Sequence, residues 1–279
     1  MKTKLNLGLI GGSGLPPAEQ IAKIRHSGFD GIFFDFGRGE KFHRRLSAAK
    51  ECHTDVVSLH SAFMRCNKLW EADESTEDVI SEQIECIRAC HDNSIPVSVH
   101  HVFIGFESHE PTEAGLYNFD RIVREGERLG VKLAFENTEG IEYFDVVMER
   151  YKNTSAVGFC IDTGHELCYN PGRDLISQYG KKLCFTHIND NLGVCRNSVT
   201  YLDDLHLLPF DGKVDFDFFA KRLREAGYRG DLTFELSRTS KPGRHENDGY
   251  AAMKFEDYLR EAYSRAEKVA SLCEKYASE

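Results

Sequence analysis

The chain has 279 residues, of which 41% are hydrophobic and 29% charged, as in an ordinary globular protein with a full core. Its net charge of −10 argues against non-specific nucleic-acid binding, because phosphate backbones attract basic surfaces. No apolar run approaches the roughly 18 residues of a membrane span, and nine cysteines without a Cys-x-x-Cys pair are unlike a secreted disulfide framework, so we expect a cytoplasmic protein.

Short apolar runs alternate with longer amphipathic stretches along the whole chain. We predict strands at 5–10, 31–36, 55–61, 96–102, 131–137, 157–162, 182–189 and 231–236. Helical spacing or composition lies between them, at 16–26, 40–51, 75–92, 113–129, 143–152, 174–179 and 216–226, and a long polar helix begins near residue 248. Such alternation is typical of parallel βα units. The sequence therefore predicts an α/β fold, a single (β/α)8 TIM barrel over residues 1–279.

Six of the predicted strands end in a residue type that binds metals. These residues are His60, His100, Glu136, Asp162, His187 and Glu235. Because a barrel builds its active site at the carboxyl ends of its strands, we expect these side chains to converge there.

Strands five to eight supply Glu136, Asp162, His187 and Glu235, which are 26, 25 and 48 residues apart. Three carboxylates and one imidazole form an oxygen-rich ligand set, which suits Mn²⁺ or Mg²⁺ and tolerates Zn²⁺ or Co²⁺. Burying these carboxylates together without a cation would be costly. We therefore predict that the four residues bind one divalent metal ion, with Mn²⁺ as the first choice.

Several short motifs surround these residues. They are Phe135-Glu136-Asn137, Asp162-Thr-Gly-His165, His187-Ile-Asn-Asp-Asn191, Asp204-Leu-His206-Leu-Leu-Pro-Phe-Asp-Gly212 with Val214-Asp-Phe216, and Phe234-Glu235. Together they resemble the xylose isomerase-like barrel superfamily of sugar isomerases, sugar epimerases and endonuclease-IV-type enzymes, and the resemblance covers most of the chain. In the sugar-epimerase branch the matching Glu, Asp, His and Glu bind one divalent metal, and the histidine that corresponds to His165 contacts the substrate.

The resemblance implies a metal-dependent sugar isomerase or epimerase. A divalent ion chelated by a ketose carbonyl and its neighbouring hydroxyl would stabilise the enediolate formed when a carbon-bound proton is removed. If Glu136 and Glu235 lie on opposite faces, one removes the proton and the other returns it, which inverts the carbon. Proton movement along one face gives isomerisation instead. We predict Glu136 and Glu235 as catalytic residues, and we predict substrate contacts from His60, His100, His165 and His206.

Two further expectations concern the neighbourhood of this site. Strand alternation predicts that His101 points away from His100, so His101 is left outside the pocket. The segment 191–213 is the longest irregular connection, and loops of that length are usually functional. Its Asp204 and His206 are interpreted as part of a substrate lid or as two further metal ligands.

The first two strands carry a pattern that superficially matches a dinucleotide-binding fingerprint. Gly11–Gly14 follow the first strand, and Asp35 ends the second. The match fails because Pro17 takes the place of the third glycine, so we interpret the segment as a barrel loop. Asp35 remains a weaker candidate for the pocket.

Other functions could use the same strand ends. In endonuclease-IV-type barrels the matching residues bind three Zn²⁺ ions for phosphodiester hydrolysis; here they are His60, His100, Glu136, Asp162, His165, His187, Asp204, His206 and Glu235. A metal-dependent sugar lyase or dehydratase would need the same proton removal. A non-catalytic metal-binding or sugar-binding subunit is disfavoured by the Glu136 and Glu235 pair. We expect a small sugar substrate and neither a nucleic-acid nor a membrane partner, and the sequence leaves homo-oligomerisation open.

Overall fold

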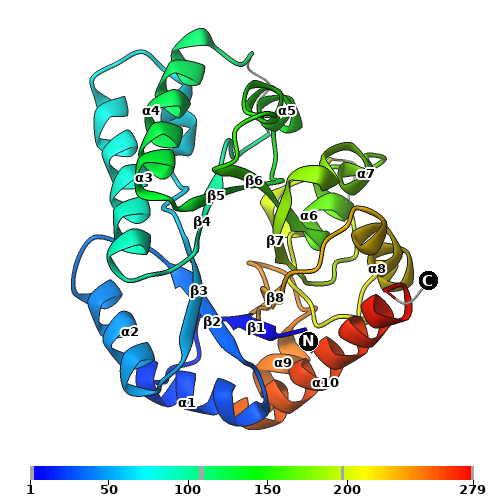
Figure 1. The fold of residues 1–279 in the computed structure, drawn as a ribbon. Helices are drawn as coiled ribbons and strands as arrows, with labels where there is room; N and C mark the ends of the chain where they lie inside the picture. The colour runs from blue at the N-terminus through cyan, green and yellow to red at the C-terminus, as the bar shows by residue number, and fades with distance from the viewer. Residues whose placement is uncertain (1–2, 107–109, 196–197, 278–279) are drawn as a thin grey trace.

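Eight parallel strands form the centre of the structure, and helices surround them (Figure 1). The computed structural model describes residues 3–106, 110–195 and 198–277. The strands are β1 (Leu5–Gly8), β2 (Gly31–Asp35), β3 (Asp55–His60), β4 (Val97–His101), β5 (Lys132–Glu136), β6 (Val157–Asp162), β7 (Leu183–His187) and β8 (Leu232–Phe234). The predicted (β/α)8 barrel is confirmed, with several strands shorter than expected.

The helices lie outside the ring of strands, as Figure 1 shows. They are α1 (Pro17–Ser27), α2 (Glu40–Glu51), α3 (Ser75–Asp92), α4 (Glu113–Leu129), α5 (Ile141–Arg150), α6 (Thr163–Cys168), α7 (Leu175–Tyr179), α8 (Phe216–Glu225), α9 (Asp248–Ala252) and α10 (Phe255–Lys275). The long final helix predicted from residue 248 is two helices, because the backbone of Met253 is extended. Within the described residues, no helix is both long and apolar enough to cross a membrane.

The barrel closes at a narrow seam between its last two strands. The hydrogen-bonded order runs from β7 through β6, β5, β4, β3, β2 and β1 to β8. Beyond this order, a single bridge pairs Ile188 with Phe234. The Ile188 amide donates to the Thr233 carbonyl over 2.8 Å, and the Glu235 amide donates to the Ile188 carbonyl over 3.1 Å. The seam thus joins β7, which ends in His187, to the strand that precedes Glu235.

The strand register decides which side chains face the barrel interior. Across the sheet, His101 pairs with Glu136 and Asp162 pairs with His187. An apolar layer fills the interior below these residues, formed by Val97, Val99, Ala134, Cys160 and Phe185. Because side chains two residues apart on a strand share a face, the strand ends place an ionisable layer directly above this apolar layer.

Candidate active site

Four side chains meet at the carboxyl end of the barrel, and we call them the central group: Glu136, Asp162, His187 and Glu235. One ligand atom of each lies within 4.8 Å of the others. The first three are buried at the ends of β5, β6 and β7, whereas Glu235 directly follows β8 and its side chain is 30% exposed. His187 Nδ1 lies 3.0 Å from Glu136 Oε1 and 2.9 Å from Glu235 Oε2. Two of the three carboxylates therefore approach the same nitrogen of the imidazole.

The donor chemistry of the central group fits a divalent cation. Burial raises the pKa of Asp162 to about 6 against the opposing effect of His165 and His206, and the nearby carboxylates of Glu136 and Glu235 add to the rise. For Glu235 burial acts in the same direction, but His187 outweighs it and lowers the pKa to about 2. One imidazole therefore compensates the three carboxylates only in part. A cation bound by three carboxylate oxygens and one imidazole nitrogen would supply the missing positive charge.

Asp162 is held in place from both sides. Its Oδ1 accepts a hydrogen bond from the His165 amide at 2.7 Å, and its Oδ2 accepts one from Asn189 Nδ2 at 2.8 Å. The side chain of Asn137 bonds both the amide and the carbonyl of Asp162, at 2.7 and 3.0 Å. The bond from the His165 amide to Asp162 Oδ1 also caps the start of α6, a helix that was not predicted from the sequence. Asp162 is thus a helix cap as well as a candidate ligand.

A second group consists of His60, His101 and Glu136, whose ligand atoms also lie within 4.8 Å of one another. His60 Nδ1 contacts the Ser61 carbonyl at 2.8 Å, and a carbonyl can only accept, so this nitrogen carries the proton. His60 Nε2 then faces Glu136 Oε2 and His101 Nε2, each at 3.2 Å. Glu136 belongs to both groups, with Oε1 toward His187 and Oε2 toward His60.

A third group consists of His165, Asp204 and His206. His165 Nδ1 donates to the Asn137 carbonyl at 2.9 Å, and His206 Nδ1 donates to the Glu235 carbonyl at 3.1 Å. Both Nε2 atoms face Asp204 Oδ1, at 3.5 and 2.9 Å. A histidine that donates one ring N–H to a carbonyl and turns the other nitrogen toward a carboxylate has the arrangement common among metal ligands. Burial lowers the pKa of His206, but Asp204 outweighs this effect and raises it to about 9.

The two histidines at the end of β4 point to opposite faces as predicted, but the choice of His100 as the inward one is wrong. His100 Nδ1 contacts Gln83 Oε1 on α3, and its Nε2 contacts Ser98 Oγ, both at 2.8 Å, so its ring lies outside the barrel. His101 takes the inward position. The register explains this result, because β4 pairs His101, not His100, with Glu136. His100 is therefore removed from the set of substrate-contacting candidates.

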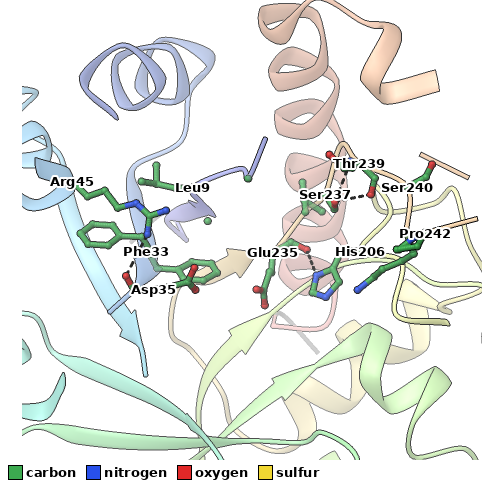
Figure 2. Close-up of a pocket in the computed structure, with 15 residues that line it drawn as sticks. Leu9, Phe33, Asp35, Arg45, His206, Glu235, Ser237, Thr239, Ser240 and Pro242 are labelled. Carbon is green, nitrogen blue, oxygen red and sulfur yellow. Dashed lines mark hydrogen bonds between the residues drawn. The ribbon is translucent and has the colours of Figure 1, made fainter. Parts of the chain in front are cut away.

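A cavity of about 380 Å³ opens beside the central group (Figure 2). Phe33, Asp35 and Arg45 lie on one wall, and Glu235 and His206 lie on the opposite wall. Glu136 is not among the lining residues, so Glu235 is the candidate proton carrier that reaches this space.

Two cavity residues were not identified from the sequence, Arg45 on α2 and Lys241 after β8. Basic residues are common on helices and in loops, and nothing in the spacing of these two marks them. The earlier candidate Asp35 does line the cavity.

Comparison with known proteins agrees with the fold. The family model described as xylose isomerase-like TIM barrel matches residues 21–256. A curated protein of Sinorhizobium fredii (strain NBRC 101917 / NGR234), the uncharacterized protein y4fM, is 30% identical over 166 residues, which are 58% of this chain and 49% of that protein. The chain thus spans about half the length of the curated relative that it matches.

Solved structures with the same fold include several sugar epimerases. D-psicose 3-epimerase from Clostridium cellulolyticum H10, solved with D-tagatose, superposes with a TM-score of 0.73 at 13% identity, over 97% of this chain and 99% of that one. The IOLI protein, solved with a zinc atom, superposes with a TM-score of 0.74 at 19% identity, over 99% of this chain and 100% of that one. The 3-keto-D-glucoside 4-epimerase YcjR from E. coli superposes with a TM-score of 0.66 at 15% identity, over 94% of this chain and 100% of that one. At these identities the likeness shows the fold.

Proposed function

The chain belongs to the xylose isomerase-like TIM barrel family, and from that premise we propose that it is a divalent-metal-dependent sugar isomerase or epimerase. The observation that carries the proposal is the central group beside the cavity, in which Glu235 both contacts His187 and lines the substrate-sized space. A divalent ion in the central group would supply Lewis-acid polarisation of a ketose carbonyl. Mn²⁺ suits this oxygen-rich set best, with Mg²⁺, Co²⁺ and Zn²⁺ as alternatives.

The side chains of the site divide the work of proton transfer. Glu235 is ionised at neutral pH, because His187 lowers its pKa, so it can accept a proton from the carbon beside the carbonyl. Glu136 contacts the same His187 Nδ1 atom and is the second proposed proton carrier. Both of its oxygens contact imidazoles, so proton return by Glu136 requires one of these contacts to be exchanged for the substrate.

The histidines have different relations to the substrate space. His206 lines the cavity, and His165 lies next to it, with Nε2 toward the same Asp204 carboxylate. We propose that these two side chains orient substrate hydroxyls. His60 lies deeper, against Glu136, and acts on the substrate through the position of that carboxylate.

Exchange of solvent deuterium into sugars tests the proposal. We expect the metal-loaded protein to incorporate deuterium beside the carbonyl of at least one sugar in a ketose panel. Glu235→Gln should keep most of the metal and lose exchange, because an amide oxygen still coordinates but cannot accept a proton. Glu225→Gln, in the last turn of α8, is the control for substitution alone. No exchange with any sugar despite bound metal contradicts the function, and undiminished exchange in Glu235→Gln excludes Glu235 as the base.

A second candidate function is three-zinc phosphodiester hydrolysis. It is favoured by the second and third groups, in which His60, His165 and His206 each donate Nδ1–H to a carbonyl and turn Nε2 toward a carboxylate. His101 here replaces His100 in the predicted nine-residue set. Measurement of metal per chain separates the candidates. Three ions per chain together with cleavage of bis(p-nitrophenyl) phosphate would favour hydrolysis, and one ion with sugar exchange would favour the isomerase or epimerase.

A further inference from the structure

Arg45 brings a positive charge to the wall of the cavity that faces Glu235. It comes from the second turn of α2, and its side chain is half-buried beside Phe33 and Asp35 (Figure 2). The guanidinium Cζ lies 5.9 Å from the centre of the Phe34 ring. Its Nη1 donates to the Asp35 carbonyl over 3.4 Å, which is a long hydrogen bond. These contacts direct the guanidinium toward the cavity but leave most of its five N–H donors unused.

No carboxylate in the described part of the chain neutralises Arg45. Its neighbour Arg44 lies 2.6 Å from Glu40, and Arg38 lies 2.6 Å from Asp78, but among the described residues no acidic oxygen lies within 4.0 Å of Arg45. The Asp35 carboxylate lines the same cavity and also lies beyond that distance from the guanidinium. The cavity therefore holds a fork of unpaired donors, which is the geometry that recognises planar or tetrahedral anions.

Open space continues beyond Arg45, away from Glu235. A second hollow is lined by the loop Gly11–Gly14 and shares Leu9, Gly11 and Arg45 with the cavity. A Cβ atom added at Gly11 or Gly14 would meet nothing within 4 Å, so this loop leaves room for part of a ligand. A molecule that reacts near Glu235 can thus place its far end at Arg45.

We propose that Arg45 binds an anionic group, a phosphate or a carboxylate, at the end of the substrate remote from the reacting carbon. The inference rests on the proposed function, and it narrows the substrate class to acidic sugar derivatives. Asp35, on the same wall, accepts hydrogen bonds from hydroxyl groups between the two ends. The Lys241 amine on the opposite wall is already paired with Asp204, 3.1 Å away, so it offers no free positive charge to the anion.

Binding of matched sugars to the metal-loaded protein tests this assignment without requiring turnover. The probes are D-fructose, D-fructose 6-phosphate and D-fructuronate, measured by calorimetry, and the last two distinguish phosphate from carboxylate. We expect one of the acidic probes to bind about tenfold to a hundredfold more tightly than D-fructose, as charge-assisted hydrogen bonds allow. Arg45→Ala should abolish this preference, and Arg45→Lys should retain part of it.

Arg25→Ala is the matched control, because Arg25 also donates to a backbone carbonyl, that of Asp30, but lies away from the cavity. The control should keep the preference. Equal binding of neutral and acidic probes by the unmodified protein overturns the inference, as does a preference that survives in Arg45→Ala. Deuterium exchange without an acidic preference would leave the proposed function standing and this inference refuted. An Arg45-dependent preference without deuterium exchange would support the anion site and contradict the proposed function.

Discussion

The ring of Phe33 stacks on the imidazole of His187, with centroids 4.7 Å apart and planes inclined by 16°. The contact depends on the neighbouring strand, because β1 pairs Gly8 with Phe33. A Cβ atom on Gly8 would lie 2.7 Å from the Phe33 ring. Gly8 therefore makes room for Phe33, and Phe33 in turn supports the plane of the imidazole whose Nδ1 faces Glu136 and Glu235.

Removal of this aromatic support should weaken metal binding. Phe33→Ala leaves His187 free to turn, and loss of such supporting contacts typically costs about tenfold to a hundredfold in metal affinity. Phe33→Leu, which keeps most of the volume, should lose less. Competition with a fluorescent chelator measures both variants. Unchanged affinity in Phe33→Ala would show that the hydrogen bonds of His187 orient it without the ring.

The two histidines at the end of β4 should respond differently to substitution. His101→Asn removes an imidazole that lies 3.4 Å from Glu136 Oε2, so we expect a loss of activity of about tenfold or more. His100→Asn disturbs the buried contacts to Gln83 and Ser98, so we expect a loss of about 1–3 kcal/mol in the free energy of unfolding with little change in activity. Urea unfolding and deuterium exchange measure the two effects. The reverse pattern would restore His100 to the site.

The third group predicts a pH dependence in the metal-free protein. Asp204 raises the pKa of His206 to about 9 against the opposing effect of burial. A raised imidazole pKa stabilises the folded state below the unfolded value of about 6.5, and this contribution disappears as the pH rises through 9. Asp204→Asn should therefore cost on the order of 2 kcal/mol at pH 6, and the cost should shrink by pH 9.5. Urea unfolding at several pH values checks this, and a cost independent of pH would contradict it.

Under the three-zinc alternative, zinc binding to the third group would release protons, since a metal ligand cannot keep its proton. Calorimetric titrations with zinc in buffers of different ionisation enthalpy measure the number of protons released. We expect this number to fall between pH 7 and 9.5 in the unmodified protein and to be smaller in Asp204→Asn. Identical release by the two proteins would place the zinc elsewhere.

Asp190 should act as an anchor for the loop 191–213. Its carboxylate accepts hydrogen bonds from the amides of Asn191, Gly212 and Val214 at 2.7, 2.8 and 2.9 Å, so it fixes both ends of the loop. Asp190→Ala should lower the free energy of unfolding by about 2–3 kcal/mol and expose residues 198–212 to proteolysis. Asp215→Ala, which removes the cap at the Phe218 amide, should cost about 1 kcal/mol and leave the loop protected. Equal proteolysis of the two variants would refute the anchor.

The sequence predicts the central group because its four residues follow strands, and parallel strands bring their carboxyl ends to one rim of a barrel. It does not predict which of two adjacent histidines faces inward. Which histidine faces inward depends on the register between β4 and β5, and this register cannot be read from the spacing of residues along the chain. Arg45 could not be predicted from the sequence for a related reason. A helical arginine reaches the cavity only because of how α2 packs beside β2, and its sequence neighbours give no sign of that placement.

A metal ion bound beside the seam between β7 and β8 would also stabilise the barrel. In the described residues two backbone hydrogen bonds, both made by Ile188, join these strands, and His187 and Glu235 lie immediately beside them. An ion held by these two side chains would link β7 to the end of β8 across this seam. Loss of the ion would then lower the stability of the ring at this seam, so the ion that supports the chemistry would also stabilise the fold.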